Sequence, residues 1–300
     1  MYSSASNSSR NDPSELKILQ DILEHGKIST VFQPIVSLKS GNIHGYEALS
    51  RGPEQMESPD QLFSVARKYS KLWELEHLCR RKALENAQIL NLHGCIFLNI
   101  SPDIINDPKL LEGMTAESIA RYGFNVSDII IEITEKSALQ DYKDYESTIN
   151  RYKAQGYSIA IDDAGSGYSG LKLIADVRPH YVKLDMDIIR DVDRDKFKLA
   201  LIKSFKDFCG ATGIKLVAEG IETAQELETL IEIGIHYGQG YFLQRPQPIP
   251  SNIDSDILQF ILEMQESQQQ IYQQRPSNIA IKHISRKMTL CSITKQGTYK

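Results

Sequence analysis

The sequence predicts an α/β protein, specifically a (β/α)₈ barrel of the TIM type in which one strand runs antiparallel. From residue 30 to about residue 245, eight short apolar runs alternate with longer helical patterns. Such alternation is typical of parallel strands joined by crossover helices, and eight units in roughly 220–250 residues suit a closed barrel. The segment 37–45 is too short for a crossover helix, so it predicts a hairpin between the first two strands. Strand number alone leaves a doubly wound open sheet as the alternative.

The apolar runs give the order of the elements. The predicted strands are residues 29–38, 42–50, 94–101, 128–134, 157–163, 180–186, 214–220 and 237–243. Helical patterns between them are clearest at 59–90, 195–212 and 223–234. The predicted segments of the chain are a disordered N-terminal tail (1–14), the barrel (15–250), a C-terminal helix (251–275), and a linker or the start of a further domain (276–300).

The composition is that of an ordinary globular protein, with 41% hydrophobic and 24% charged residues. A formal net charge of −5 supplies no basic field, so we expect no nucleic-acid polymer as a partner. No apolar run approaches the roughly 18 residues that cross a bilayer, and residues 1–16 lack the apolar core of a secretory signal. The four cysteines are far apart and form no C-x-x-C pair, which favours reduced thiols in a cytoplasmic protein over a zinc site or disulfides.

Nearly every predicted strand carries a polar residue near its C-terminal end, although strands buried on both faces should be apolar throughout. In strand order these residues are Glu47, Asn99, Glu132, Asp162 with Asp163, Lys183, Glu219 and Gln239. Any one of them alone is more often a structural polar group or a strand end in solvent. The same placement on successive strands is better explained by a shared site, because barrel strands converge at one mouth, where active sites lie.

The residue types at these positions indicate a metal site. Carboxylates and one amide form an all-oxygen set without His or Cys, which favours Mg²⁺ or Mn²⁺ over Zn²⁺. Two consecutive aspartates, Asp162 and Asp163, can serve two ions, and close ion pairs are used for in-line phosphoryl displacement. Lys183 could orient the attacking water and stabilise negative charge on phosphorus, or it could simply balance the carboxylates.

Three glycines after the fifth predicted strand fit a dinucleotide-binding pattern, namely Gly165, Gly167 and Gly170. The pattern also has an acid twenty residues on, Asp185, so an NAD-dependent oxidoreductase is an alternative. A bound pyrophosphate would meet the carboxylates of Asp162 and Asp163 directly, which would repel it. We therefore interpret the glycines as turn residues of a loop beside the metal site.

Eight short motifs resemble those of the EAL family of cyclic di-GMP phosphodiesterases over about residues 28–250. They are "FQPIVSL", "YEALSR", "FLNIS", "IEITE", "DDAGSGYSGL", "VKLD", "AEGIE" and "GQGYFLQRP", in that order. The family fold is a barrel with one antiparallel strand, in agreement with the predicted hairpin. The resemblance implies hydrolysis of cyclic di-GMP, a bacterial second messenger, to linear pGpG with two Mg²⁺ or Mn²⁺ ions, and inhibition by Ca²⁺.

The resemblance also implies a role for individual residues. One metal ion would be held by Glu47, Asn99, Glu132 and Asp162, and the second by Asp162, Asp163 and Glu219. The catalytic residues would be Glu47, Lys183 and Glu219, with Lys183 engaging the nucleophilic water. The substrate would be bound by Gln33, Leu49, Arg51, Asp185 and Gln239, with Arg51 on a phosphate. Residues that support the metals and the loop would be Glu135, Gly165, Gly167 and Glu222.

Two positions depart from the family pattern. Ala164 replaces the usual Phe, and Gly170 stands where a second Ser is common. No expected metal ligand is missing, which favours an enzyme, while a weak or inactive cyclic di-GMP receptor is the alternative. We also expect a homodimer and fused or interacting sensory or cyclase domains.

Overall fold

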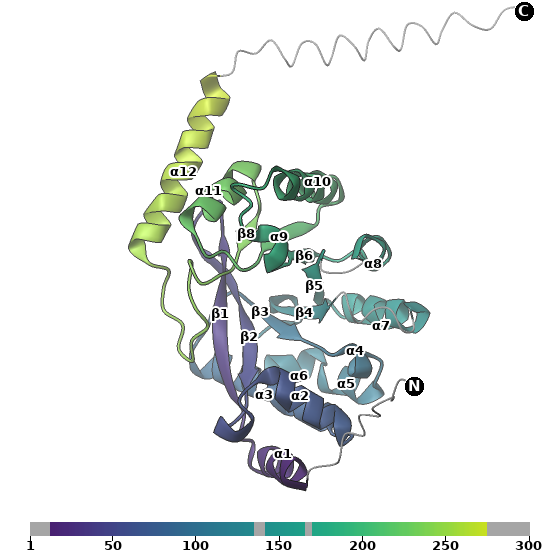
Figure 1. Ribbon diagram of the computed structural model, residues 1–300. Coiled ribbons are helices and arrows are strands. Elements are labelled where there is room, and N and C mark those ends of the chain that lie inside the picture. The colour runs from purple at the N-terminus through teal and green to yellow at the C-terminus, as the bar shows by residue number, and fades with distance from the viewer. Residues whose placement is uncertain (1–12, 135–141, 166–169, 275–300) are drawn as a thin grey trace, which may run out of the picture.

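The computed structural model describes residues 13–134, 142–165 and 170–274, and these form a closed eight-stranded barrel surrounded by helices (Figure 1). Neighbouring strands follow the order of the sequence around the barrel. The strands are β1 (Ser29–Ser37), β2 (Ile43–Arg51), β3 (Cys95–Asn99), β4 (Ile129–Thr134), β5 (Ser158–Ala164), β6 (Tyr181–Leu184), β7 (Lys215–Ala218) and β8 (Tyr237–Gly238). The predicted barrel is confirmed, and the alternative of an open sheet is excluded.

Strand β1 is the antiparallel strand. It pairs antiparallel with β2 on one side and with β8 on the other, while all other neighbouring strands pair in parallel. The turn between β1 and β2 begins with Gly41 N donating to Ser37 O at 2.8 Å, and Gly41 has a φ of +70°, which favours glycine. The predicted hairpin is therefore present and sets the direction of β1.

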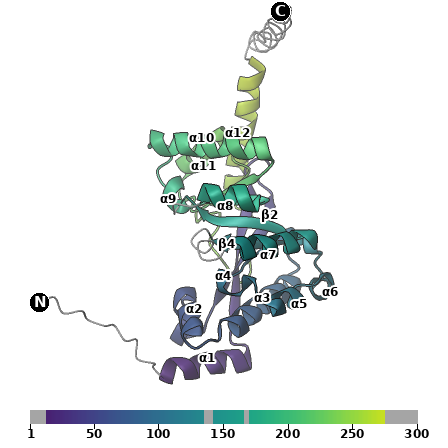
Figure 2. The same cartoon turned by 90° about the vertical axis from the view of Figure 1, so that its right-hand side faces the viewer.

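Helices cover the outside of the barrel, as Figure 2 shows from a second direction. They are α1 (Pro13–His25), α2 (Pro59–Lys68), α3 (Leu72–Ile89), α4 (Pro102–Ile105), α5 (Pro108–Gly113), α6 (Ala116–Ala120), α7 (Tyr142–Ala154), α8 (Gly170–Val177), α9 (Met186–Ile189), α10 (Lys196–Thr212), α11 (Ala224–Ile233) and α12 (Ser255–Gln274). Short 3₁₀ turns, η1 (Glu54–Met56) and η2 (Val126–Asp128), complete the set. In both views α1 to α3 lie at one end of the molecule and α10 to α12 at the other.

The single helix predicted at 59–90 is wrong, because the chain breaks it into α2 and α3. Ser70 adopts a left-handed conformation with a φ of +55°. Lys71 N then donates to Ala66 O at 2.8 Å, the six-to-one hydrogen bond that ends a helix in a Schellman motif. Glycine usually occupies the left-handed position, and the serine there gave no sequence signal for the break.

The predicted eighth strand at 237–243 is also too long. Only Tyr237 and Gly238 form β8. After them Gly240 packs so closely on the backbone of Ile221 that a Cβ atom would lie 2.2 Å from Ile221 N. The chain then turns, with Gln244 N donating to Gly240 O at 3.0 Å, so the strand cannot continue.

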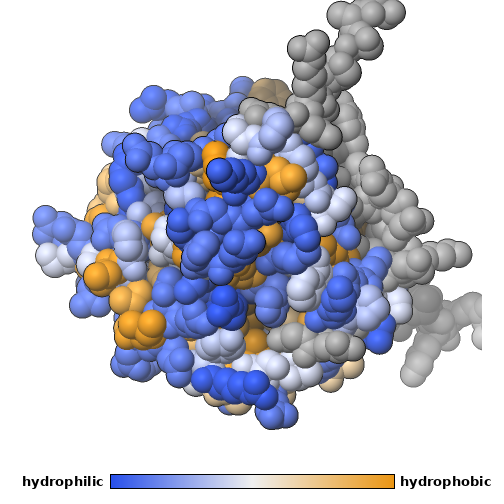
Figure 3. Space-filling view, turned by 90° about the horizontal axis from the view of Figure 1, so that it is seen from below, coloured by the Kyte–Doolittle hydropathy of each residue, from blue (hydrophilic) through white to orange (hydrophobic). Residues whose placement is uncertain are grey.

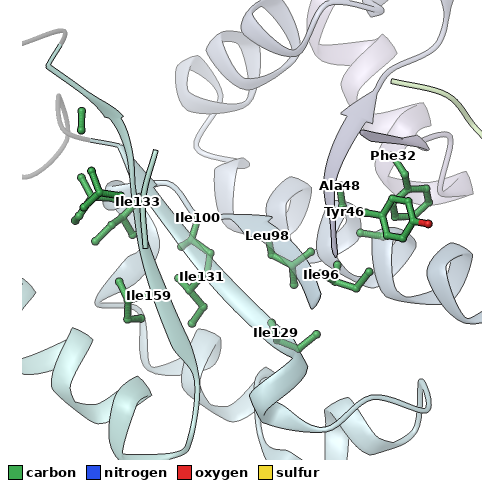
Figure 4. Packing of buried hydrophobic residues seen from close by; sticks show 14 of the residues in the cluster. Phe32, Tyr46, Ala48, Ile96, Leu98, Ile100, Ile129, Ile131, Ile133 and Ile159 are labelled. Atoms are coloured by element: carbon green, nitrogen blue, oxygen red, sulfur yellow. The ribbon is translucent and has the colours of Figure 1, made fainter. Parts of the chain in front are cut away.

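Successive side chains along each strand point to opposite faces of the sheet, and this divides the core into two parts. One set of side chains points outward and packs under the helices, as Figure 4 shows for residues such as Ile96, Leu98 and Ile131. The other set fills the interior of the barrel with Ile35, Phe97, Ile130, Ala160 and Val217. The interior is therefore a packed layer of side chains, and any polar site must lie above or below it.

The ends of the described chain pack as helices. Helix α1 begins at Pro13, and α12 packs against α11, with Gln268 Nε2 donating to Ile231 O at 2.9 Å.

Hydrophilic residues cover most of the face seen in Figure 3, with hydrophobic residues in scattered groups. Among the described residues, every helix is too short or too polar to span a bilayer.

Candidate active site

The polar residues at the strand ends form one layer directly above the apolar interior of the barrel. On β3, β4, β5 and β7, the residue two positions beyond the interior apolar side chain is polar, and these residues are Asn99, Glu132, Asp162 and Glu219. Side chains two residues apart in a strand share a face, so all four point into the barrel. Because each follows its interior apolar residue along a parallel strand, all four lie toward the same end of the barrel. Parallel pairing keeps them level, since Asn99 aligns with Glu132 across β3 and β4.

Lys183 on β6 lies at the centre of this layer. Its Nζ is surrounded by one carboxylate oxygen from each of four acids: Glu132 Oε1 at 2.8 Å, Glu219 Oε1 at 2.8 Å, Asp162 Oδ1 at 3.0 Å and Glu47 Oε2 at 3.2 Å. The lysine is fully buried, as is Glu132. Such a cluster is stable only when its charges compensate each other.

A bulge in β5 brings a second aspartate to the same site. Ile161 pairs with Val182 and Ala164 with Leu184, so Asp162 and Asp163 together oppose the single residue Lys183. Asp163 takes a left-handed φ of +54°, which turns its side chain away from the alternation of the strand. As a result, Asp162, Asp163 and Glu219 each place an oxygen within 4.8 Å of the others.

Two amide side chains hold Glu47 in place, and a third supports one of them. Asn99 Nδ2 donates to Glu47 Oε1 at 3.0 Å, and Gln239 Nε2 donates to Glu47 Oε2 at 2.7 Å. Gln239 also donates to Gln33 Oε1 at 2.9 Å, and Gln33 in turn donates to the carbonyl of Gln244 at 3.2 Å. Both glutamines are buried, so this network fixes the carboxylate from the side of β1 and β8.

The pKa values of the cluster diverge. Burial acts to raise the pKa of Glu47, but the charge of Lys183 and the hydrogen bonds from Gln239 and Asn99 outweigh it and lower this pKa. Burial raises the pKa of Glu132 and of Glu219 well above the ordinary value, and repulsion from neighbouring acids adds to it. Burial opposes the charge of Lys183, yet the four acids raise the pKa of the lysine well above its usual value.

The donor set fits divalent cations. Lys183 Nζ lies 2.8 Å from Glu132 Oε1, and the other oxygen of Glu132, Oε2, is buried without a hydrogen-bond partner among the described residues. One lysine could not neutralise four acids and Asp163 if all of them were ionised, so a bound cation would stabilise their ionised forms. Oxygen-only ligands of this kind suit Mg²⁺ or Mn²⁺.

Two cavities adjoin the cluster and share Leu49. The acidic cavity, of about 370 Å³, is lined by Gln33, Glu47, Leu49, Asp162, Asp163, Asp185, Met186, Glu219, Gly220, Glu222, Gln239, Gly240 and Tyr241. The arginine cavity, of about 350 Å³, includes Arg51, Arg67, Arg80, Glu76 and Asn99 in its wall. The structure therefore places the predicted substrate residues Gln33, Leu49, Asp185 and Gln239 around one cavity and Arg51 in the other.

Of the remaining predicted residues, Glu222 lines the acidic cavity, and Ala164 and Gly165 lie at the end of β5. Glu222 forms a two-point ion pair with Arg190, at 2.5 and 2.8 Å, and hydrogen bonding to Arg190 lowers the pKa of Glu222. Gly165 has a φ of +98°, and a Cβ atom on it would lie 2.1 Å from Ile188 Cδ1. Ala164 is buried and pairs with Leu184. Glu135 and Gly167 lie outside the described residues.

The described residues of the dinucleotide pattern take part in other interactions. The side chain of Asp185 accepts a hydrogen bond from Asp187 N at 2.7 Å and caps α9. The strand before the glycines ends in the bulge that carries Asp162 and Asp163, so the approach a pyrophosphate would need is occupied by carboxylates.

Sequence reasoning missed two buried charged features near the site. Glu76 and Arg80 pair within α3, and Glu226 accepts hydrogen bonds from Asp191 N, Glu222 N and Thr223 N. Thr223 and Glu226 form a capping box, whose Thr-x-x-Glu spacing was visible in the sequence. Glu76 and Arg80 stand four apart among apolar helix residues, and this spacing was the only signal for their pairing.

Comparisons with known proteins agree with this geometry. The family model described as EAL domain matches residues 16–246. A protein of Escherichia coli (strain K12) named probable cyclic di-GMP phosphodiesterase PdeB is 32% identical over 236 residues, which make up 77% of this chain and 45% of that protein. The chain thus spans less than half of the length of this curated relative.

Two solved structures resemble the barrel. A standalone versatile EAL protein from Vibrio cholerae O395, in its c-di-GMP bound form, is 31% identical with a TM-score of 0.68, covering 76% of this chain and 95% of that one. The manganese/cy-diGMP complex of Klebsiella pneumoniae BlrP1 at pH 9.0 is 27% identical with a TM-score of 0.69, covering 74% of this chain and 56% of that one.

Proposed function

The chain belongs to the EAL domain family, and from this premise we propose that it is a metal-dependent phosphodiesterase that hydrolyses cyclic di-GMP to linear pGpG. The observation that carries the proposal is the cluster of four acids around Lys183, with Asp163 beside it, at the mouth of the barrel. The similar Klebsiella pneumoniae structure contains manganese together with the cyclic dinucleotide, which supports both the metal and the substrate class.

Two Mg²⁺ or Mn²⁺ ions are the proposed cofactors. One would be held by Glu47, Asn99, Glu132 and Asp162, and the other by Asp162, Asp163 and Glu219. The unpaired Glu132 Oε2 supports the first set, and the convergence of three carboxylates supports the second. Ions bound there would lower the pKa of a water molecule and neutralise charge that develops on the phosphoryl group.

Lys183 would act as a fixed cation in the reaction. In the metal-free protein four carboxylates hold the pKa of Lys183 well above the usual value, so the side chain carries its positive charge there. An ammonium group in this position can donate a hydrogen bond to the attacking water and stabilise negative charge on the phosphoryl oxygens. Its fixed geometry comes from β6, which is a rigid element of the barrel.

The shape of the site supports a dinucleotide as substrate. The two cavities, of about 370 and 350 Å³, adjoin at Leu49, so a ligand with two nucleotide halves can extend from one into the other. Arg51 in the arginine cavity would bind a phosphate through its guanidinium group. Tyr241, half exposed at the edge of the acidic cavity and backed by Arg245 at 4.1 Å, offers an aromatic face to a base.

The direct test is a hydrolysis assay with purified protein, in which cyclic di-GMP and pGpG are separated by chromatography. We expect pGpG with Mg²⁺ or Mn²⁺ and little product with Ca²⁺, which prefers larger and looser coordination. Glu132→Gln, which keeps the shape of the side chain, should abolish product, while the control Glu74→Gln, on a partly exposed side chain outside both cavities, should not.

Calorimetry with cyclic di-GMP separates the enzyme from the alternative receptor. Binding without product under all three ions would support a receptor that holds the dinucleotide without turnover. If the protein neither binds nor cleaves it, both functions fail.

Two further expectations belong to the same proposal. The chain would act as a homodimer, which light scattering of the purified protein would detect as twice the mass of the chain. It would also work with a sensory or cyclase domain, as the greater length of the curated relative suggests. A monomer at all concentrations would remove the first expectation without affecting the chemistry.

A further inference from the structure

A buried ion pair lies behind the loop that follows β3, outside the acid cluster. Glu76 and Arg80 are 3% and 6% exposed, and Arg80 Nη1 lies 2.8 Å from Glu76 Oε2. Both residues come from α3 and stand one helical turn apart. Burial of a charged pair is expensive and adds little to stability by itself, so a specific role for one of its members is worth seeking.

The carboxylate of Glu76 binds the backbone beside the metal site. Ser101 N donates to Glu76 Oε1 at 3.1 Å, and Oε2 lies 3.4 Å from the same nitrogen. Ser101 is two residues beyond Asn99, the last residue of β3. Glu76 therefore fixes the chain where it leaves the strand that presents the Asn99 amide.

Other contacts fix the same loop from two more directions. Ile100 N donates to the backbone carbonyl of Glu132 at 3.0 Å, which ties the loop to β4. Arg67 on α2 donates to Ser101 Oγ at 3.0 Å and to Asp103 Oδ2 at 2.8 Å. Of these anchors, only the one made by Glu76 comes from a buried charged side chain.

We propose that Glu76 is a positioning residue for Asn99, and that it holds the β3 exit loop so that the Asn99 amide can serve as a metal ligand. This inference rests on the proposed function, because it treats Asn99 as a ligand. Asn99 is itself exposed, and its side-chain Nδ2 donates to Glu47. The direction of the side-chain oxygen Oδ1 therefore depends on where the backbone of the β3 exit loop is held. Groups that orient a ligand in this way typically change metal affinity by about 10- to 100-fold.

The test compares two double variants by calorimetric titration with Mn²⁺. Glu76→Leu with Arg80→Met removes the acceptor for Ser101 N without leaving a buried charge unpaired. Glu76→Gln with Arg80→Met removes the same ion pair but keeps an oxygen for Ser101 N. We expect the first variant to bind Mn²⁺ at least about 10-fold more weakly than the second, which should stay within about threefold of the wild type. Glu85→Gln, which removes a partly exposed ion-pair partner on the same helix, is the control.

A cycle with Asn99→Ala shows whether Glu76 acts through Asn99. In the Asn99→Ala background, the two double variants should differ in Mn²⁺ affinity by less than about twofold, since the ligand to be positioned is gone. Equal effects in both backgrounds, or no difference between the leucine and glutamine variants, would overturn the inference. If the leucine variant does not fold, Arg67→Met loosens the same loop from an exposed position and should weaken Mn²⁺ binding only when Asn99 is present.

The outcomes also separate this inference from the proposed function. Absence of Mn²⁺ binding by the wild type, or full affinity in Asn99→Ala, contradicts the assignment of the metal site. Binding that depends on Asn99 but not on the acceptor at position 76 contradicts only the role of Glu76.

Discussion

Replacing Lys183 with methionine should destabilise the metal-free protein strongly. Methionine has a similar length but no charge, so the change leaves four acids without the cation that lies 2.8–3.2 Å from each of them. Removing one partner of a buried ion pair typically costs about 3–5 kcal/mol. For a chain of this size about 2–4 °C of melting temperature corresponds to 1 kcal/mol, so we expect a decrease of roughly 6–20 °C.

The pH and metal dependence of this loss identify its cause. Burial already holds the folded-state pKa values of Glu132 and Glu219 well above the unfolded value of 4.5, and loss of the lysine charge, which lowers both, would raise them further. The folded state then binds more protons than the unfolded state, so the deficit of Lys183→Met should shrink as the pH falls from about 7 toward 5. Mn²⁺ should also raise the melting temperature of the variant more than that of the wild type, because it replaces the missing positive charge.

Thermal denaturation followed by circular dichroism, with chelator and with Mn²⁺, measures both effects. Lys71→Met is a matched control, since Lys71 makes an ion pair of 2.8 Å with Glu74 but the two side chains are 40% and 42% exposed. Exposed pairs contribute about 0–1 kcal/mol, so this variant should melt close to the wild type. The counter-ion role of Lys183 is contradicted if metal-free Lys183→Met and Lys71→Met have the same melting temperature, or if the loss of melting temperature in Lys183→Met is independent of pH.

Three further variants test other parts of the structure. Asp163→Asn keeps a residue that tolerates the φ of +54° and removes a like charge, so metal-free stability should stay equal or rise while calorimetric Mn²⁺ affinity falls at least about 10-fold. Gly165→Ala should lower the melting temperature and the rate of hydrolysis, because its Cβ would lie 2.1 Å from Ile188 and its φ is +98°; unchanged values would contradict the close packing. Burial and nearby lysines lower the pKa of His236 to about 4 in the folded protein. As the pH falls, the unfolded chain therefore binds this proton before the folded protein does, and the free energy of unfolding decreases between pH 6.5 and about 4. Since this side chain is partly exposed we expect a loss of about 1–2 kcal/mol, and His236→Gln should reduce that slope in denaturant titrations.

The sequence was sufficient to predict the barrel and the residues that meet at its mouth. Parallel strands of a closed barrel all end on one side, so a polar residue at the end of each strand implies a shared site without knowledge of any contact. The structure brings Glu47, Glu132, Asp162 and Glu219 together around Lys183 for this reason. The hairpin that reverses β1 was equally predictable, because a connection of a few residues cannot cross the barrel.

Features that depend on unusual backbone conformations were not predictable. The break between α2 and α3 occurs at Ser70, and the bulge in β5 occurs at Asp163, and both residues adopt a positive φ without being glycine. Nothing in the local sequence distinguishes them, since the conformations are stabilised by hydrogen bonds and packing from other elements. The bulge matters most, because it is what allows two consecutive aspartates to face one site.

Two interpretations of Lys183 that the sequence left as alternatives are compatible in the structure. As a counter-ion, the lysine takes one oxygen from each of four acids and thereby holds the layer together before any metal binds. The same contacts orient the acids, and Glu132 Oε2 stays without a hydrogen-bond partner among the described residues, available for ligation. A lysine that was only a catalyst would not need four carboxylate contacts, and three of the four acids it contacts line the acidic cavity. Its position at the centre of the layer lets one charge serve both the stability of the metal-free site and the chemistry proposed for it.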